Sequence, residues 1–60
     1  MRPTAYEQAK IYFDCYGYKE STSIASQMLR LYRNNLDERE YWCKVIDELD
    51  TMERDRVSVI

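Results

Sequence analysis

The sequence predicts an all-α protein, and three observations lead to this prediction. Apolar residues recur every three or four positions along three stretches, which is the spacing of one helix face. Each stretch begins with residue types that cap helix starts. The chain of 60 residues has one glycine and one proline, which argues against a loop-rich scaffold held by disulfides. We therefore expect one small domain over residues 1–60, with helices at about 4–16, 22–33 and 37–55.

The first helix is predicted from a capping box and an apolar face. Thr4 and Glu7 stand three residues apart, so each side chain can satisfy a free backbone amide at the helix start. Gly17, the only glycine, lies where a helix end often takes a left-handed residue, so the helix should end near Tyr16. The apolar face comprises Ala5, Tyr6, Ala9, Tyr12, Phe13 and Tyr16.

The second helix should follow a turn over residues 18–23, with Ser21 or Thr22 as its N-cap. Asn34 and Asn35 should close it, because asparagine tolerates the left-handed conformation better than most residues. Its apolar face comprises Ile24, Ala25, Met28, Leu29, Leu31 and Tyr32.

The third helix should be the longest element. Asp37 and Glu40 repeat the capping-box pattern, and Leu36 is placed to pack on Tyr41 as a hydrophobic staple. Its length exceeds that of either neighbour, so a partner of similar length would cover its apolar stripe best. We therefore favour a homodimer, with a hairpin of the first two helices across the third as the alternative. The expected core is Tyr6, Ala9, Phe13, Tyr16, Ile24, Met28, Leu31, Trp42, Val45, Ile46, Leu49 and Met52.

The composition argues against several classes of function. The chain has no histidine, which is the commonest general base, and no glycine-rich phosphate loop, so we expect no enzyme and no catalytic residue. Two isolated cysteines cannot complete a zinc site, and no cofactor or metal is expected. No run of 18 apolar residues could span a membrane, and the start lacks an apolar signal-peptide stretch, so we expect a cytoplasmic protein.

Two surfaces are candidates for contact with other molecules. Ile11 and Cys15 leave the main apolar face of their helix and, with the stripe of the third helix, suggest contact with a second copy or another protein. This candidate interaction surface is Ile11, Cys15, Tyr41, Trp42, Val45, Leu49 and Met52. A candidate acidic face, which is either solvated or docks a basic partner, is Asp37, Glu40, Asp47, Asp50 and Asp55. The apolar tail over residues 57–60 either frays or docks on the core or another subunit.

The order of three helices also suggests a helix-turn-helix DNA-binding protein, and the charges decide against it. Residues 37–56 hold eight acidic and four basic residues, a net charge of −4, whereas residues 1–36 carry +2. Phosphate contacts dominate affinity for nucleic acids, so the third helix would be repelled from the groove. A DNA-binding regulator that uses Arg30, Arg33 and the basic N-terminal half remains the alternative function.

In length, helical content, tyrosine use and lack of catalytic groups, the chain resembles the small accessory proteins of temperate (lambdoid-type) phages and prophages. Its LDERE helix start is similar to that of small helical modulators of the Hha type. These resemblances imply a small regulator and assign no site residue. The leading hypothesis is therefore a non-enzymatic interaction protein that binds an unknown protein partner through a helical surface.

Overall fold

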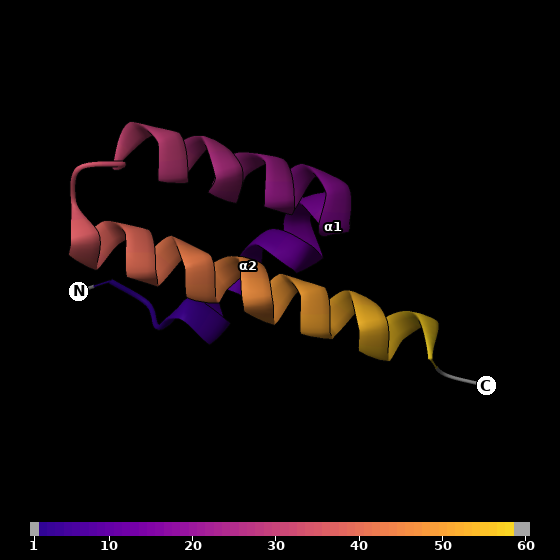
Figure 1. Ribbon diagram of the computed structural model, residues 1–60. Coiled ribbons are helices and arrows are strands. Elements are labelled where there is room, and N and C mark those ends of the chain that lie inside the picture. Colours follow the sequence, from indigo (N-terminus) through magenta and orange to yellow (C-terminus); the bar gives the residue numbers. More distant parts are fainter. Residues whose placement is uncertain (1, 59–60) are drawn as a thin grey trace.

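The computed structural model describes residues 2–58, and these form a helical hairpin (Figure 1). Helix α1 spans Ala5–Leu31 and helix α2 spans Leu36–Val57, with a short turn between them. The all-α class is therefore confirmed. Neither helix is long and apolar enough to cross a membrane within these residues.

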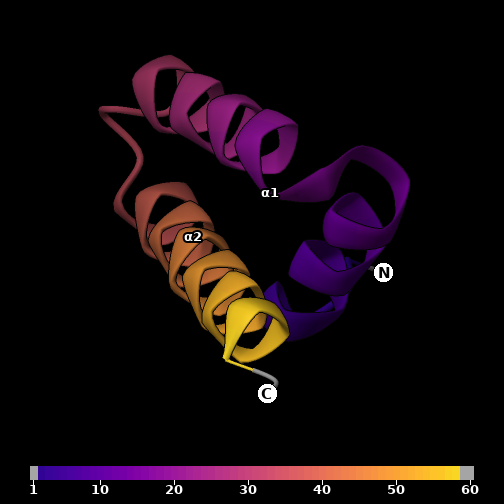
Figure 2. The ribbon, with the colours of Figure 1, turned by 90° about the vertical axis from the view of Figure 1, so that its right-hand side faces the viewer.

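Helix α1 bends sharply at Gly17. The backbone of Gly17 has φ 82° and ψ 176°, a combination that is essentially restricted to glycine. The helical segments before and after Gly17 consequently run in different directions, and both pack against α2 (Figure 2). The hairpin thus has three helical arms around one core, although it has only two helices.

The prediction of three helices is wrong. Residues 18–21, which were expected in a turn, continue α1, so the interruption is confined to Gly17. Ser21 and Thr22 are not N-caps: Ser21 is buried, and the Thr22 hydroxyl donates to the carbonyl oxygens of Tyr18 and Lys19 at 3.1 and 3.0 Å. The backbone freedom of one glycine changes the chain direction without the longer turn that the sequence suggested.

The helix starts match the prediction in α1 and differ from it in α2. The Thr4–Glu7 capping box is present, with Thr4 Oγ1 accepting from Glu7 N at 3.1 Å and Glu7 Oε1 accepting from Thr4 N at 2.9 Å. The N-cap of α2 is Asn35, whose side chain accepts from Glu38 N at 3.2 Å. The predicted capping box at Asp37 is therefore wrong, and Asp37 instead places its charge in the first turn, where the helix dipole favours it.

The core joins small side chains of α1 to large side chains of α2. Its fully or almost fully buried members are Ala9, Ser21, Ala25, Trp42, Val45 and Leu49. The Trp42 ring stacks on Tyr12 with 6.2 Å between centroids and meets Tyr41 edge-on at 5.3 Å. The small residues of α1 let the helices approach closely, so the bulk of the core comes from α2.

The expected core was only partly right. Ala9, Trp42, Val45 and Leu49 are buried as predicted, whereas Tyr6, Tyr16 and Leu31 are exposed, because the two arms of α1 turn their small residues toward α2. The other predicted core members are half-buried; they are Phe13, Ile24, Met28, Ile46 and Met52.

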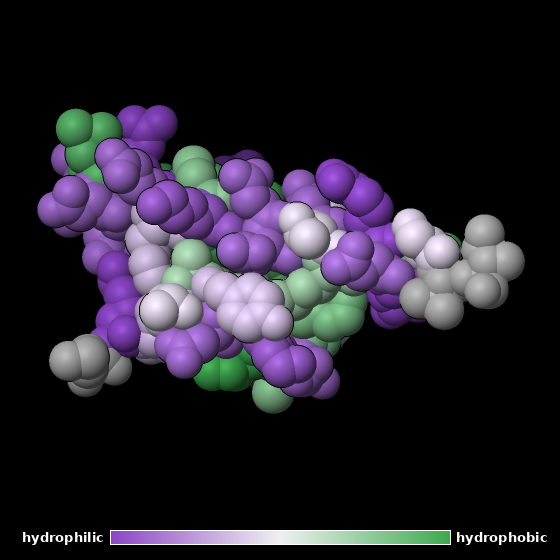
Figure 3. All heavy atoms as spheres, turned by 90° about the horizontal axis from the view of Figure 1, so that it is seen from below, coloured by the Kyte–Doolittle hydropathy of each residue, from purple (hydrophilic) through white to green (hydrophobic). Residues whose placement is uncertain are grey.

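The apolar stripe of α2 is covered by α1 within one chain. The sequence argument for a dimer assumed that this stripe lacks a partner, and the bend at Gly17 removes that premise. From below, the surface is mostly hydrophilic, with its apolar areas in separate patches (Figure 3). Self-association therefore stays a prediction that would need another surface.

In the tail, Val57 ends α2 in an exposed position, and residues 59–60 lie outside the described residues.

Gly17→Ala should destabilise the fold by about 1–3 kcal/mol, because an L side chain is strained at this backbone conformation. An added Cβ would meet no atom within 4 Å, so the cost should come from the backbone alone. Urea unfolding followed by circular dichroism measures it. A synthetic chain with D-alanine at position 17 is the matched control, and it should be at least as stable as the natural chain. Equal losses for both enantiomers would contradict this account.

Ser21→Ala should stabilise the fold by about 1 kcal/mol. Ser21 Oγ is buried without a hydrogen-bond partner, and a buried unpaired hydroxyl costs free energy. Ser23→Ala in the same helix is the control, because Ser23 is exposed and its replacement changes only helix propensity. Thermal melting should show a larger gain for Ser21→Ala than for Ser23→Ala. A loss of stability on Ser21→Ala would refute the unpaired hydroxyl.

Candidate interaction surface

Most of the predicted interaction surface lies inside the hairpin. Trp42, Val45 and Leu49 are buried against α1, while Tyr41 and Met52 are half-buried beside them. Trp42, Val45 and Leu49 could reach a partner only if the hairpin opened. The contacts that these five side chains make in the structure are within the same chain.

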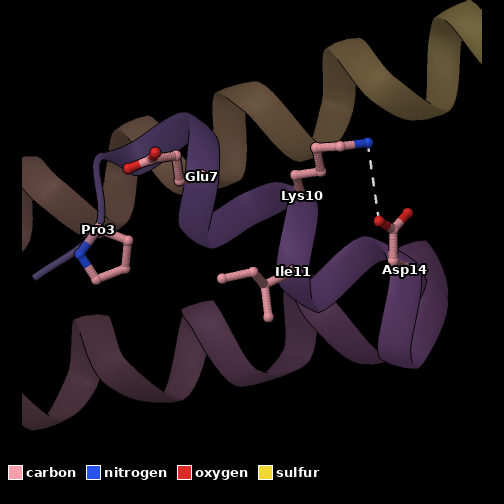
Figure 4. A pocket seen from close by; sticks show the side chains of 5 residues that line it. All are labelled: Pro3, Glu7, Lys10, Ile11 and Asp14. Atoms are coloured by element: carbon pink, nitrogen blue, oxygen red, sulfur yellow. Dashed lines mark ion pairs between the residues drawn. The ribbon is translucent and has the colours of Figure 1, made fainter.

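Ile11 and Cys15 are exposed on the outer side of the first arm of α1. Ile11 lines an open hollow of about 410 Å³ with four neighbours, Pro3, Glu7, Lys10 and Asp14 (Figure 4). The charged groups of this hollow already have partners: Glu7 caps Thr4, and Lys10 pairs with Asp14 at 3.7 Å. A ligand here would therefore gain little beyond apolar contact.

The candidate acidic face holds four of its five members in exposed positions. Asp37, Glu40, Asp47 and Asp55 are exposed, whereas Asp50 is half-buried and accepts a hydrogen bond from the Tyr18 hydroxyl at 2.5 Å. This hydrogen bond, aided by desolvation, raises the pKa of Tyr18. Because Tyr18 follows Gly17 directly, Asp50 serves to hold the bend of α1 against α2.

The N-terminal lead is tied to the first half of α2. The Arg2 guanidinium donates to both carboxylate oxygens of Glu38, at 2.6 and 2.5 Å, and lies 4.1 Å from the centroid of the Tyr41 ring. The Tyr41 hydroxyl donates to the carbonyl oxygen of Pro3 at 2.8 Å. The hydrogen bond from Arg2 holds the pKa of Glu38 below its usual value.

The indole of Trp42 lies one turn beyond Glu38 and contributes in a minor way to this lowered pKa. Its Nε1 is nevertheless buried without an acceptor at hydrogen-bond geometry. Trp42 thus acts in the core through its ring.

A second surface, which the sequence did not predict, lies between the end of α1 and the start of α2. A groove of about 470 Å³ is lined by Leu29, Arg30, Arg33, Arg39 and Cys43. It shares Arg39 and Cys43 with an adjoining hollow of about 320 Å³. We call this surface the basic groove; its residues are Leu29, Arg30, Arg33, Leu36, Arg39, Glu40, Cys43 and Lys44.

The basic groove stays open because the first arm of α1 packs elsewhere. Pro3 and Tyr12 contact the side of α2 that carries Tyr41 and Trp42, and they leave the side with Arg39 and Cys43 uncovered.

The cations of the basic groove form no ion pair among residues 2–58. Within residues 2–58, no carboxylate lies within 4.0 Å of the charged nitrogens of Arg30, Arg33, Arg39 or Lys44. The groove therefore has four unpaired cations, one acidic member, Glu40, and three apolar members, Leu29, Leu36 and Cys43. This arrangement suits binding of an anionic group rather than proton transfer.

Comparison with known proteins adds no family to this description: no family profile, no curated protein and no solved structure gives a significant match to the chain.

Glu38→Gln should lower the melting temperature at neutral pH, because it removes the charge partner of Arg2. The pKa of Glu38 is lowered in the folded protein, so its stabilisation is present above the ordinary value of 4.5 and is lost as the pH falls through the folded value. The difference between Glu38→Gln and the natural chain should therefore vanish in acid. Glu20→Gln, at an exposed site that forms no ion pair with any of residues 2–58, is the control. A difference that persists in acid would exclude the ion pair as its cause.

Proposed function

We propose that this chain is a non-enzymatic interaction protein that binds a protein partner through the basic groove. The observation that supports it is Leu36, which is 71% exposed and lines one hollow of the groove with the unpaired cations Arg39 and Lys44. A large apolar side chain among unpaired charges gives a partner both a surface to desolvate and groups to bind. A regulatory role and a phage or prophage origin are part of the proposal and rest on the resemblance described above.

The size of the surface is compatible with a protein partner. A standard interface takes about 800 Å² from each side, which is roughly a sixth of the 4711 Å² exposed by this chain. The basic groove draws residues from both helices and the turn, so a partner can lie across the end of the hairpin without disturbing the core.

Nucleic acid is the competing ligand, since the arginines of the alternative DNA-binding function, Arg30 and Arg33, lie in this groove. Glu40 lies in the same groove, and Asp37 is close to it on α2. A continuous phosphate backbone would have to pass these carboxylates, and the rest of α2 is acidic as well. A protein segment can place its charges selectively, so we favour a protein partner.

The proposal predicts that Leu36→Asp abolishes partner capture. The tagged chain is used to capture proteins from a bacterial lysate, which are then quantified by mass spectrometry. Leu31→Asp is the matched control, because Leu31 is 70% exposed near the same turn but does not line the groove. Proteins retained by the natural chain and by Leu31→Asp should be missing from Leu36→Asp. Capture that is equal for both variants, or no specific capture at all, would reject the proposal. Circular dichroism verifies that each variant is folded.

A further inference from the structure

We propose that the basic groove recognises an acidic segment of its partner, in which carboxylates flank an apolar side chain. This inference rests on the proposed function and deepens it, because it names the chemistry of the partner rather than only the surface that binds it.

The charges of the groove favour carboxylates. Arg30 at the end of α1, Arg33 in the turn and Arg39 in α2 all line the groove, so a segment bound there meets guanidinium groups from both helices and the turn. A guanidinium binds a carboxylate through two parallel hydrogen bonds, which gives directional as well as electrostatic recognition. Lys44 extends the positive charge along α2 into the adjoining hollow. Carboxylates spaced along one segment can therefore each find a separate cation.

The apolar residues of the groove favour a ligand that carries an apolar side chain as well as negative charge. Leu29 and Cys43 lie among the arginines, and the exposed Leu36 borders them in the adjoining hollow. A simple polyanion would leave these side chains in water. An apolar side chain between the carboxylates would cover them and remove water from the surrounding ion pairs, which strengthens those pairs.

The hollow around Ile11 lacks this combination. Its one cation, Lys10, pairs with Asp14, and Glu7 accepts a hydrogen bond from the backbone of Thr4, so the hollow has no unpaired cation for an anionic ligand. The basic groove, by contrast, combines four unpaired cations with the exposed Leu36.

The test measures fluorescence anisotropy of labelled synthetic peptides with the full natural chain. The main probe alternates glutamate and leucine; the others are a glutamate-only peptide, a lysine–leucine peptide and a short DNA duplex. The glutamate–leucine peptide should bind most tightly and should weaken as salt is added. Arg39→Glu should weaken its binding by at least about tenfold, since an attractive contact becomes a repulsive one.

Arg54→Glu is the matched control for Arg39→Glu. Arg54 lies on the same helix, is exposed, forms no ion pair within residues 2–58 and does not line the groove. It should therefore leave binding of the glutamate–leucine peptide nearly unchanged. Equal weakening by the two variants would show an effect of net charge alone and would overturn the inference. Arg33→Glu, in the turn, provides a second groove variant if Arg39→Glu fails to fold.

The remaining outcomes separate the inference from the proposed function. If the chain binds the DNA duplex more tightly than the glutamate–leucine peptide, the ligand of the groove is a nucleic acid and the inference is overturned. Light scattering that shows a salt-sensitive dimer, disrupted by Arg39→Glu, would make a second copy of the chain the occupant and would overturn it too. If no acidic peptide binds while Leu36→Asp still abolishes partner capture, the inference fails and the proposed function stands. If partner capture also fails, both are rejected.

Discussion

The whole core depends on the backbone conformation of Gly17. One helix can bring both Ala9 and Ala25 to α2 only if the chain changes direction between them, and Gly17 achieves this in a single residue. The large side chains of α2 then fill the space that the small ones leave. A straight α1 would present only one of its arms to α2 and would lose contacts of the other arm, such as the stacking of Tyr12 on Trp42. The bend therefore converts a two-helix hairpin into a core that a chain of 60 residues can close by itself.

The sequence predicted the helical class, the Thr4 cap and the buried stripe of α2, because these depend on local spacing. It did not predict how α1 continues past Gly17. A glycine with positive φ can end a helix or bend it, and Ser21 and Thr22 are ordinary capping residues that favoured a new start. Tertiary contacts decide whether the glycine ends the helix or bends it. In this chain they are the burial of Ser21 and the hydrogen bond from Tyr18 to Asp50, and a local sequence pattern shows neither of them.

The basic groove escaped prediction for a related reason. Along the sequence, Arg39 lies in a segment, residues 37–56, whose net charge is −4, so it does not stand out as part of a basic surface. The hairpin turn brings Arg39 beside Arg30 and Arg33, which belong to the basic half of the chain. Leu36 was interpreted as a staple on Tyr41, yet it is the first residue of α2 and faces solvent. The position of a surface relative to its neighbours in space, rather than its composition, determines what it can bind.

The contacts of the N-terminal lead also bear on the order in which the chain folds. Arg2 and Glu38 are 36 residues apart, and Pro3 and Tyr41 are 38 apart, so these contacts close loops longer than half the chain. Contacts around the turn join α1 to α2 over far shorter separations. Because closing a longer loop costs more entropy, the turn-proximal halves of the hairpin should pair first and the leading arm should dock last. The basic groove belongs to the part that forms early, so a partner could engage it on a chain whose first arm is still open.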